Sequence, residues 1–261
     1  MRALFTAATG MSAQQLKIDN IANNIANVNT VAFKRGREDF QDLFYQRIRT
    51  AGVSSTAGGT APVGVEVGHG VRTAAVEKMF TQGTFTTTQN ELDIAIEGHG
   101  FYQLETPTGE TVYTRAGNFK RNSLGEMVSV DGYKLKPGFA IPQDAVSIAV
   151  SQDGVVSVTQ AGQSAPAQLG TIELVRFINP AGLEPLGRNV FRVTDNSGQP
   201  IVGTPGQQGI GTLAQGFVES SNVDIAEEMV QMIIAQRSFE TNSKVMSVSD
   251  QLMQYTNNMV R

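Results

Sequence analysis

The 261-residue sequence contains no cysteine, no tryptophan and only two histidines. Without cysteine the chain cannot form disulfides, use a thiolate in catalysis or hold a metal through sulfur. The absence also suits a protein that passes between compartments and cannot depend on one redox state. The formal net charge is −4, and the sequence has no basic stripe that could neutralise phosphates. We therefore expect no nucleic-acid partner.

Long apolar runs are also missing, because no stretch approaches the ~20 apolar residues of a membrane span. The opening residues Met-Arg-Ala-Leu-Phe are not followed by an apolar core and a small-residue cleavage site. We therefore expect no cleaved secretory signal, and a chain that is either cytoplasmic or exported with its N-terminus intact. The 27 glycines exceed the usual share of about 7% and indicate many turns.

The residue types that usually carry catalysis do not form a convincing cluster. His69 and His99 each lie between two glycines, where a histidine in a tight turn is more common than a metal ligand. Glu91, Asp93 and Glu97 are candidates for a catalytic carboxylate pair. Asp93 and Glu97, however, fall on the polar face of a predicted strand, where solvated carboxylates are ordinary. We expect no enzyme activity, no cofactor and no metal.

The sequence does contain a helical pattern at its N-terminal end, from Leu4 to Asn29. Its apolar residues recur seven apart, and such a repeat lines one stripe of an α-helix that can pack as a coiled coil. Asn20, Asn24 and Asn27 fall on the other, polar side. The stripe is thin, so one partner helix would leave it marginal and several would stabilise it. The predicted stripe is Leu4, Met11, Ile18, Ile21, Ile25 and Val28.

A second helical pattern occupies residues 217–261, which contain neither proline nor glycine. Ser221 and Asn222 are the candidate N-caps, and Asp224 lies three residues after Ser221 as in a capping box. The helix has one row repeating every seven residues and a second row beside it. The first row is Met232, Phe239, Met246 and Met253, and the second is Val245, Val248, Leu252, Tyr255 and Met259. We predict that the helices at the two chain ends pair.

The pattern changes twice after the first helix. Phe40, Leu43, Phe44 and Ile48 have helical spacing, so residues 38–49 are predicted to form a short amphipathic helix. Residues 51–64 are mostly Gly, Ser, Thr and Ala, which cannot bury enough apolar area to fold alone. They are either a flexible linker or an extended arm that becomes ordered against neighbouring copies.

Short alternating segments follow from residue 65 onward. Leu92, Ile94 and Ile96 alternate with more polar residues, as in a half-buried strand. Asp131-Gly132 and Asp153-Gly154 predict hairpin turns. Strands and helices do not alternate, so a parallel sheet is not expected. The predicted class is α+β, with long terminal α-helices paired as a coiled coil, an inserted mainly antiparallel β domain and an extended arm.

Four stretches resemble the signature segments of the bacterial flagellar rod and hook family. They are residues 22–34, 82–102, 113–119 and 217–244, and they follow the order and spacing of that family nearly end to end. The chain length and residues 45–62 most resemble the distal-rod branch of the family, since hook proteins are usually longer and lack this stretch. Hook and proximal-rod subunits are the alternatives within the family.

The resemblance implies a structural subunit that the flagellar type III export apparatus secretes without signal cleavage. It also implies helical self-assembly into a hollow, rigid shaft of the basal body that crosses the periplasm and transmits motor torque. The partners implied are further copies of the chain, the proximal rod proteins, the hook protein or the hook–rod junction, and the P- and L-ring bushing proteins.

The resemblance also assigns roles to parts of the chain. Residues 1–33 and 217–261 would form the inner tube, residues 34–70 the short helix and the arm, and residues 71–216 the outer β domain. The subunit interface would comprise the N-terminal stripe together with Met232, Phe239, Met246, Leu252 and Met253. The rod-stiffening arm residues would be Tyr45, Ile48, Ser54, Ser55 and Pro62.

A function of another class stays open at this point. The chain could be an oligomeric surface-binding β module whose helical ends only hold copies together. That interpretation predicts an exposed aromatic platform in the β domain. The absence of tryptophan and the presence of only five tyrosines weigh against it.

Overall fold

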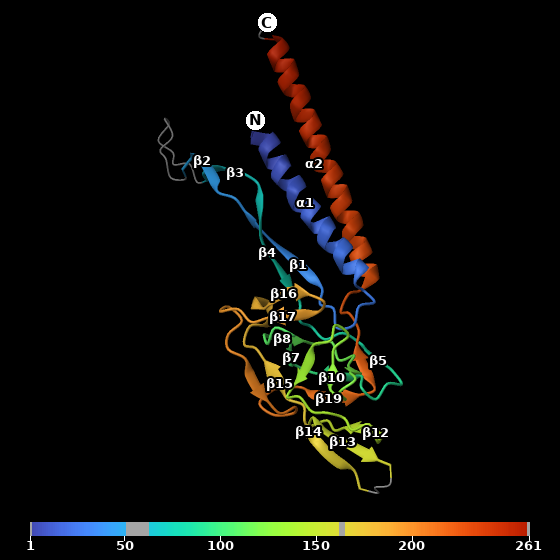
Figure 1. Cartoon of the computed structure of the whole chain (residues 1–261). Helices are drawn as coiled ribbons and strands as arrows, with labels where there is room; N and C mark the ends of the chain where they lie inside the picture. Colours follow the sequence, from blue (N-terminus) through green and yellow to red (C-terminus); the bar gives the residue numbers. More distant parts are fainter. Residues whose placement is uncertain (1, 51–62, 162–164, 260–261) are drawn as a thin grey trace. The chain divides into compact units, whose positions relative to one another are not determined.

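A computed structural model describes residues 2–50, 63–161 and 165–259, which form two compact units (Figure 1). The first unit contains residues 2–26, 36–50, 63–77 and 224–259, and the second contains residues 27–35 and 78–223 where described. The α+β class is confirmed, because the sequence begins and ends with a long helix and the strands between them are mainly antiparallel. The arm residues Ser54, Ser55 and Pro62 lie outside the described residues.

The first unit is built on two helices, α1 (Arg2–Ala26) and α2 (Ile225–Met259). They pack along each other in an antiparallel sense (Figure 1), since Lys17 contacts Gln231 and the later residue Asn24 contacts the earlier residue Glu228. Helix α1 ends three residues before the predicted Asn29. The residues that follow the helix form a turn, in which the Thr30 N–H donates to the Asn27 carbonyl at 3.1 Å.

The predicted start of the C-terminal helix is wrong. The N-cap is Asp224, whose Oδ1 accepts hydrogen bonds from the N–H groups of Ala226 at 2.8 Å and Glu227 at 3.3 Å. Residues 217–219 instead form strand β20 (Phe217–Glu219), which pairs with β5 (Phe85–Thr87). The backbone hydrogen bonds of residues 217–219 are therefore made to a neighbouring strand and not within a helix. Ser221 and Asn222 lie between β20 and the start of α2.

The predicted amphipathic helix over residues 38–49 is also wrong. This segment forms β1 (Gly36–Asp42) and β2 (Tyr45–Arg49). They pair with β4 (Val71–Lys78) and β3 (Val65–Gly68), respectively. No apolar helical face is buried, and Phe44 is 93% exposed. The strand partners come from residues 65–78, and their hydrogen bonds override a helical spacing that is only local.

The second unit is antiparallel β structure. Its largest sheet has the order β16-β17-β8-β7-β11-β10-β9, and β15 pairs with both β7 and β18. A three-stranded sheet has the order β12-β13-β14, and β19 pairs with β6. These elements are β6 (Ile94–Glu97), β7 (Phe101–Glu105), β8 (Thr111–Thr114), β9 (Lys120–Arg121), β10 (Met127–Val128), β11 (Lys134–Lys136), β12 (Ala145–Val150), β13 (Val155–Gln160), β14 (Ala167–Thr171), β15 (Leu174–Arg176), the 3₁₀ turn η1 (Pro180–Gly182), β16 (Glu184–Gly187), β17 (Val190–Arg192), β18 (Ile201–Gly203) and β19 (Thr212–Gln215).

Both predicted hairpin turns are confirmed. Asp131-Gly132 joins β10 to β11, and Asp153-Gly154 joins β12 to β13. In each turn the glycine has a positive φ, 84° and 85° respectively, which a side chain would disfavour.

The β unit has a core in which Tyr102, Leu104 and Phe119 are almost completely buried. A second cluster stacks Phe101 edge-on against Phe177. The expectation of a solvated carboxylate at Asp93 is wrong. Asp93, which directly precedes β6, is only 8% exposed and accepts a hydrogen bond from Asn90. It is buried because β6 packs into this core. Glu97, in contrast, is exposed.

Candidate subunit interface

The contact between α1 and α2 is made largely by small and polar side chains. Ala7, Ala13 and Ala235 are buried, and a Cβ added to Gly10 would lie 2.9 Å from Asn242 Nδ2. The two helices therefore approach closely without large apolar knobs.

The predicted stripes run beside these small residues. In α1 Ile21 is buried, whereas most of the remaining stripe and the first row of α2 are half-buried. The half-buried members are Leu4, Met11, Ile18, Ile25, Met232, Phe239, Met246 and Met253. The predicted place of Val28 on this helix is wrong, because α1 ends at Ala26 and Val28 lies in the turn that follows.

Asn24 fixes the position of α1 against both of its neighbours in this unit. Its side chain is 1% exposed. Its amide donates to the Gly36 carbonyl at 3.1 Å and to Glu228 Oε2 at 3.3 Å, and its oxygen accepts from the Gly36 N–H at 2.9 Å. Asn20 also donates to the Gly36 carbonyl, at 2.9 Å. The predicted polar face of α1 is thus partly an interior surface, which sequence periodicity did not reveal.

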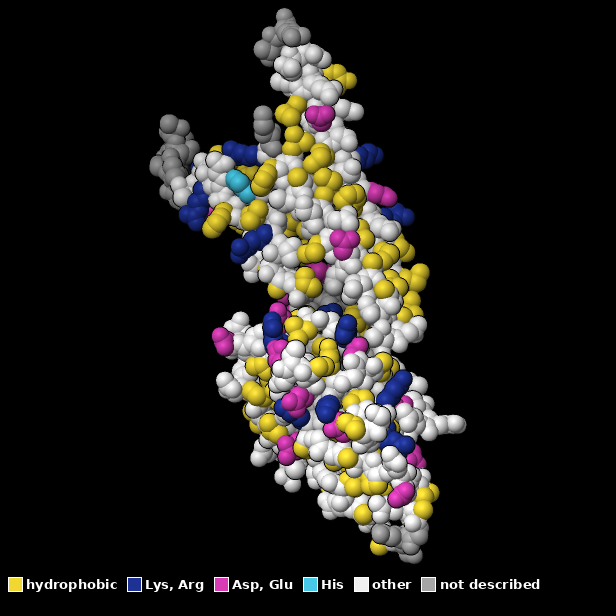
Figure 2. Space-filling model, in the orientation of Figure 1, with side chains coloured by type: hydrophobic (Ala, Val, Ile, Leu, Met, Phe, Trp, Pro, Cys, Tyr) yellow, Lys and Arg dark blue, Asp and Glu magenta, His cyan; other side chains and the backbone are white. Residues whose placement is uncertain are grey.

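The second apolar row of α2 is left exposed by the residues that the structure describes. Leu252 is 61% exposed, Tyr255 69% and Met259 86%, and Val245 and Val248 are also exposed. At 3.6 residues per turn this row lies roughly 80–160° around α2 from the buried Ala235. Hydrophobic side chains gather over the helices of this unit in Figure 2. Apolar exposure at helical spacing over several turns indicates a contact surface for another molecule. We refer to Val245, Val248, Leu252 and Tyr255 as the outer stripe.

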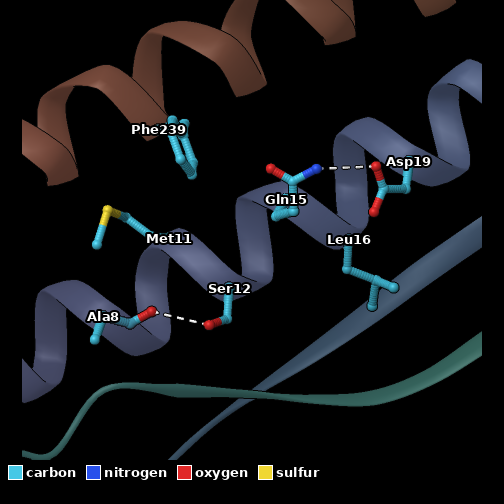
Figure 3. Close-up of a pocket in the computed structure, with 7 residues that line it drawn as sticks. All are labelled: Ala8, Met11, Ser12, Gln15, Leu16, Asp19 and Phe239. Carbon is cyan, nitrogen blue, oxygen red and sulfur yellow. Dashed lines mark hydrogen bonds between the residues drawn. The ribbon is translucent and has the colours of Figure 1, made fainter.

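A groove of about 550 Å³ runs along the outward face of α1 (Figure 3). Met11 and Leu16 flank it, and Phe239 of α2 lies along one side. The polar residues Ser12, Gln15 and Asp19 follow one line along α1 between them, and Gln15 Nε2 donates to Asp19 Oδ1 at 3.0 Å. The lining residues are Ala8, Met11, Ser12, Gln15, Leu16, Asp19 and Phe239.

The predicted arm is only partly described. Tyr45 and Ile48 lie on β2, where both are exposed. The Tyr45 ring lies over Gly68 of β3, since a Cβ on that glycine would meet the ring edge at 3.4 Å. These two residues therefore belong to a two-stranded ribbon.

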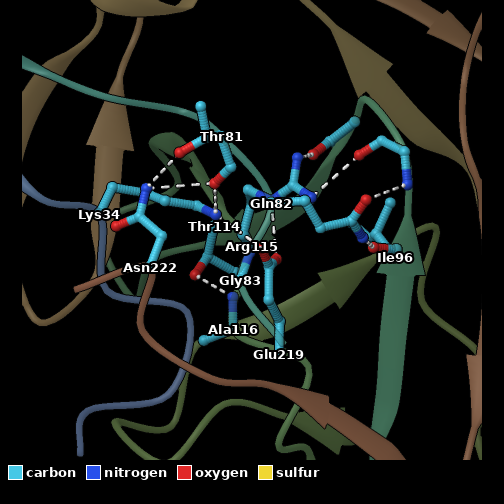
Figure 4. A network of polar contacts seen from close by, with 12 residues as sticks. Lys34, Thr81, Gln82, Gly83, Ile96, Thr114, Arg115, Ala116, Glu219 and Asn222 are labelled. Carbon is cyan, nitrogen blue, oxygen red and sulfur yellow. Dashed lines mark hydrogen bonds and ion pairs between the residues drawn. The ribbon is translucent and has the colours of Figure 1, made fainter. Parts of the chain in front are cut away.

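A buried ionic network lies in the second unit, around Glu219 of β20 (Figure 4). Glu219 Oε1 accepts from Lys34 Nζ at 2.6 Å and from the Gly83 N–H at 2.9 Å, and Oε2 accepts from Arg115 Nε at 2.9 Å. Lys34 also donates to the Thr81 carbonyl at 2.8 Å. All three charged side chains are at most 3% exposed.

The electrostatics of this network are unbalanced, because two cations surround one carboxylate. Burial lowers the pKa of Lys34 to about 8, and the Arg115 charge acts in the same direction, whereas Glu219 opposes both. For Glu219, burial alone would raise the pKa, but Arg115, Lys34 and the hydrogen bonds lower it overall. The carboxylate is therefore the group that holds the network together.

The network joins all four stretches that carry the family resemblance. Lys34 ends the first stretch, Gly83 lies in the second, Arg115 in the third and Glu219 in the fourth. Asn222, which was predicted as an N-cap, adds to this junction by donating to the carbonyl of Met79 at 2.8 Å. Charged residues within these stretches were the available sequence signal, but their separation of up to 185 positions in the sequence concealed that they are in contact.

The described residues contain no cluster of side chains arranged as a metal-binding centre. No group of three or more His, Asp or Glu side chains there could hold a metal ion. In the part of the chain that is described, the helices also lack the combination of length and apolarity needed to cross a bilayer. The features left to explain are therefore the outer stripe, the groove and the buried network.

Three family models match the chain. They are described as flagella basal body rod protein (residues 4–34), flagellar hook protein FlgE/F/G D1 domain (residues 95–158) and flagellar basal body rod FlgEFG protein C-terminal (residues 214–259).

Relatives of known identity match the chain over its full length or over part of it. The chain is 49% identical to the flagellar basal-body rod protein FlgG of Borreliella burgdorferi, over 100% of this chain and 99% of that protein. It is 39% identical to FlgG of Bacillus subtilis over the whole of both chains. The flagellar hook protein FlgE of Treponema pallidum is 40% identical, but over only 61% of this chain and 35% of that protein.

Proposed function

Because the chain belongs to the FlgG family of flagellar basal-body rod proteins, we propose that it is a structural subunit of the distal rod. Copies of it assemble helically into a rigid, hollow shaft that transmits motor torque to the hook. The similarity to FlgG extends over whole chains, whereas the similarity to a hook protein covers part of each. That difference favours a rod subunit over a hook subunit.

The observation that carries this proposal is the uncovered outer stripe of α2. A lone helix with apolar residues such as Leu252 and Tyr255 exposed over several turns is poorly suited to remain a monomer. Each such side chain contributes about 1.5–3 kcal/mol when buried. Contacts of this size repeated around a tube would resist shear between subunits, which is the load that torque produces. In the tube the terminal helices pack as coiled coils and the β unit faces outward.

The remaining parts of the proposal concern the surroundings of the rod. The subunit leaves the cytoplasm through the flagellar type III export apparatus without signal cleavage, and the rod crosses the periplasm. It contacts the proximal rod proteins at one end and the hook protein or hook–rod junction at the other, within the P- and L-rings. The arm, including Tyr45 and Ile48, stiffens the shaft through contacts with neighbouring copies. Family membership and the exposure of these two residues support this part.

The test is electron microscopy of the purified full-length protein over a range of concentrations. We expect straight tubes for the natural chain and none for Val248→Asp, which places a charge in the outer stripe. The matched control is Ser247→Asp, one residue away on the polar side of α2, which should still assemble. Curved tubes would favour the hook alternative. A chain that stays monomeric at every concentration, or normal tubes from Val248→Asp, would overturn the proposal.

A further inference from the structure

We propose that the side chains of Gln215 and Glu91 form an edge guard, an autoinhibitory contact that keeps strand β12 from pairing with a strand of another molecule. β12 is an edge strand of the three-stranded sheet, because among the described strands only β13 pairs with it. The edge guard lies entirely within the β unit. It is therefore independent of the outer stripe of α2 and of the rod assignment.

The sequence of β12 is of the kind that pairs readily with other strands. It reads Ala-Val-Ser-Ile-Ala-Val, with no charge, no proline and no glycine. Six-residue segments of this composition stack between chains when their edges are left open. Val146 of this strand is 69% exposed. An unprotected β12 would therefore be a site of association between copies.

Other edge strands of the β unit carry their own protection. In the largest sheet, the edge strand β9 consists only of Lys120 and Arg121, which are both charged. At the other end of that sheet, β16 contains Glu184 and Pro185, and proline has no N–H to donate to a new neighbour. Charge, proline and short length are the common means of protecting an edge. β12 has neither charge nor proline, so its protection has to come from outside the strand.

The edge guard supplies hydrogen bonds to the outer side of β12. Gln215 Nε2 donates to the Ile148 carbonyl at 2.8 Å, and Gln215 Oε1 accepts from the Val150 N–H at 2.9 Å. Glu91 Oε2 accepts from the Ile148 N–H at 2.9 Å. In an antiparallel pair, every second residue directs its backbone groups away from the partner strand. Ile148 and Val150 are two such residues, and side chains occupy three successive groups that a further strand would need.

The amide of Gln215 takes the place of a peptide group from a neighbouring strand. A primary amide presents N–H donors and a carbonyl acceptor in one plane, as a peptide group does. Its Nε2 also donates to the Glu91 carbonyl at 2.8 Å, which joins the two guard residues. Gln215 ends β19, and its backbone pairs with the buried Ile94 of β6. A competing strand would therefore have to displace side chains that are anchored to the core of the unit.

The first arm of the experiment measures amide hydrogen exchange in the full-length chain, at a concentration at which it stays monomeric. The double variant Gln215→Met/Glu91→Met keeps long side chains but removes the amide and the carboxylate. Exchange at the Ile148 and Val150 amides should become about threefold to tenfold faster, as expected for the loss of an ordinary hydrogen bond. Glu91→Gln retains an acceptor oxygen and should leave the Ile148 amide protected. Unchanged exchange in the double variant would overturn the proposal.

The second arm measures association by sedimentation velocity in a Val248→Asp background, which disables the outer stripe. Adding Gln215→Met/Glu91→Met should lower the concentration at which the chain associates by about tenfold, the equivalent of one or two new backbone hydrogen bonds. A further Val146→Lys places a charge on the open edge and should reverse this effect. The matched control is Gln152→Met, at an exposed position of the turn after β12, which should leave association unchanged.

The outcomes decide whether β12 is the strand that the edge guard protects. Association that persists with Val146→Lys, or that Gln152→Met produces equally, would count against the proposal. If the double variant loses its native tyrosine fluorescence, Gln215→Met alone provides the same test, since it removes three of the four hydrogen bonds described above. If Val248→Asp still forms tubes, the rod proposal fails and the exchange measurement decides this one separately.

Discussion

Replacement of Glu219 by glutamine is the most informative perturbation of the β unit. The side chain is 1% exposed and accepts hydrogen bonds from Lys34, Arg115 and the Gly83 backbone at 2.6, 2.9 and 2.9 Å. Glutamine has nearly the same volume, so packing is preserved while the negative charge is lost. Lys34 and Arg115 would then lie buried beside each other without their carboxylate. Removing one partner of a buried ion pair costs about 3–5 kcal/mol of the free energy of unfolding.

Removal of Lys34 should cost much less, although it contacts the same carboxylate. Lys34→Met leaves Glu219 paired with Arg115, so the network becomes neutral. Burial already holds the pKa of Lys34 near 8, which means that the charged form is costly to keep inside. We expect a loss of about 1.5–3 kcal/mol, typical of hydrogen bonds to a charged group. Glu219→Gln should therefore destabilise the fold more than Lys34→Met, because only Glu219→Gln leaves buried positive charges without a negative partner.

Urea unfolding of the full-length chain measures both effects. Tyrosine fluorescence reports mainly on the β unit, where Tyr102 and Tyr113 are buried and tryptophan is absent. The matched control is Glu110→Gln, a half-exposed carboxylate at the rim of the sheet, which should change stability by less than about 1 kcal/mol. The reasoning is refuted if Glu219→Gln costs under about 1 kcal/mol, or if Lys34→Met costs as much as Glu219→Gln.

Four further expectations concern pH, the helical unit and assembly. Because the folded pKa of Glu219 lies below its reference of 4.5, its contribution is complete above that pH and is lost as the pH falls through the folded value. The urea midpoints of the natural chain and Glu219→Gln should therefore converge on acidification, and a constant gap down to pH 2 would count against this. Lys34 has the same direction in a different pH range, since its folded pKa of about 8 lies below 10.5. The natural chain should gain stability relative to Lys34→Met as the pH rises from about 8 to about 10.5, and an unchanged difference there would contradict the shift. Asn24→Ala removes the hydrogen bonds to Gly36 and Glu228 and should destabilise the helical unit by about 1–3 kcal/mol. Amide exchange at Gly36 should speed up accordingly, and unchanged protection there would show that Asn24 is not needed. Ile21→Asp, at a buried position of α1, should abolish tube formation and leave tyrosine fluorescence native, so normal tubes would exclude a role for the N-terminal stripe.

The parts of the fold that follow from local periodicity were predictable. Residues spaced seven apart, such as Met232 and Phe239, mark one face of a helix whatever it packs against. The turns at Gly132 and Gly154 follow from the positive φ that glycine tolerates. Those features depend on neighbours within a few positions, so a single sequence contains all the information needed.

The errors occurred where a distant partner changed the outcome. Helical spacing around Phe40 and Phe44 predicted a helix, but strands from residues 65–78 pair with this segment and supply its hydrogen bonds. Residues 217–219 belong to a strand because β5 pairs with them, which moves the N-cap to Asp224. Asn24 was placed on a polar face, yet Gly36 and Glu228 surround it.

The sequence by itself determined that this chain has helical ends with more apolar surface than one partner can cover, a β region between them, and four segments typical of flagellar axial proteins. The tertiary structure decided how those segments combine. Lys34, Gly83 and Arg115 meet at Glu219 only after the β unit folds, and α2 keeps one apolar row half-buried while leaving the other exposed. Periodicity identifies the faces of a helix, but long-range packing selects which face is satisfied inside the chain and which is left for another copy.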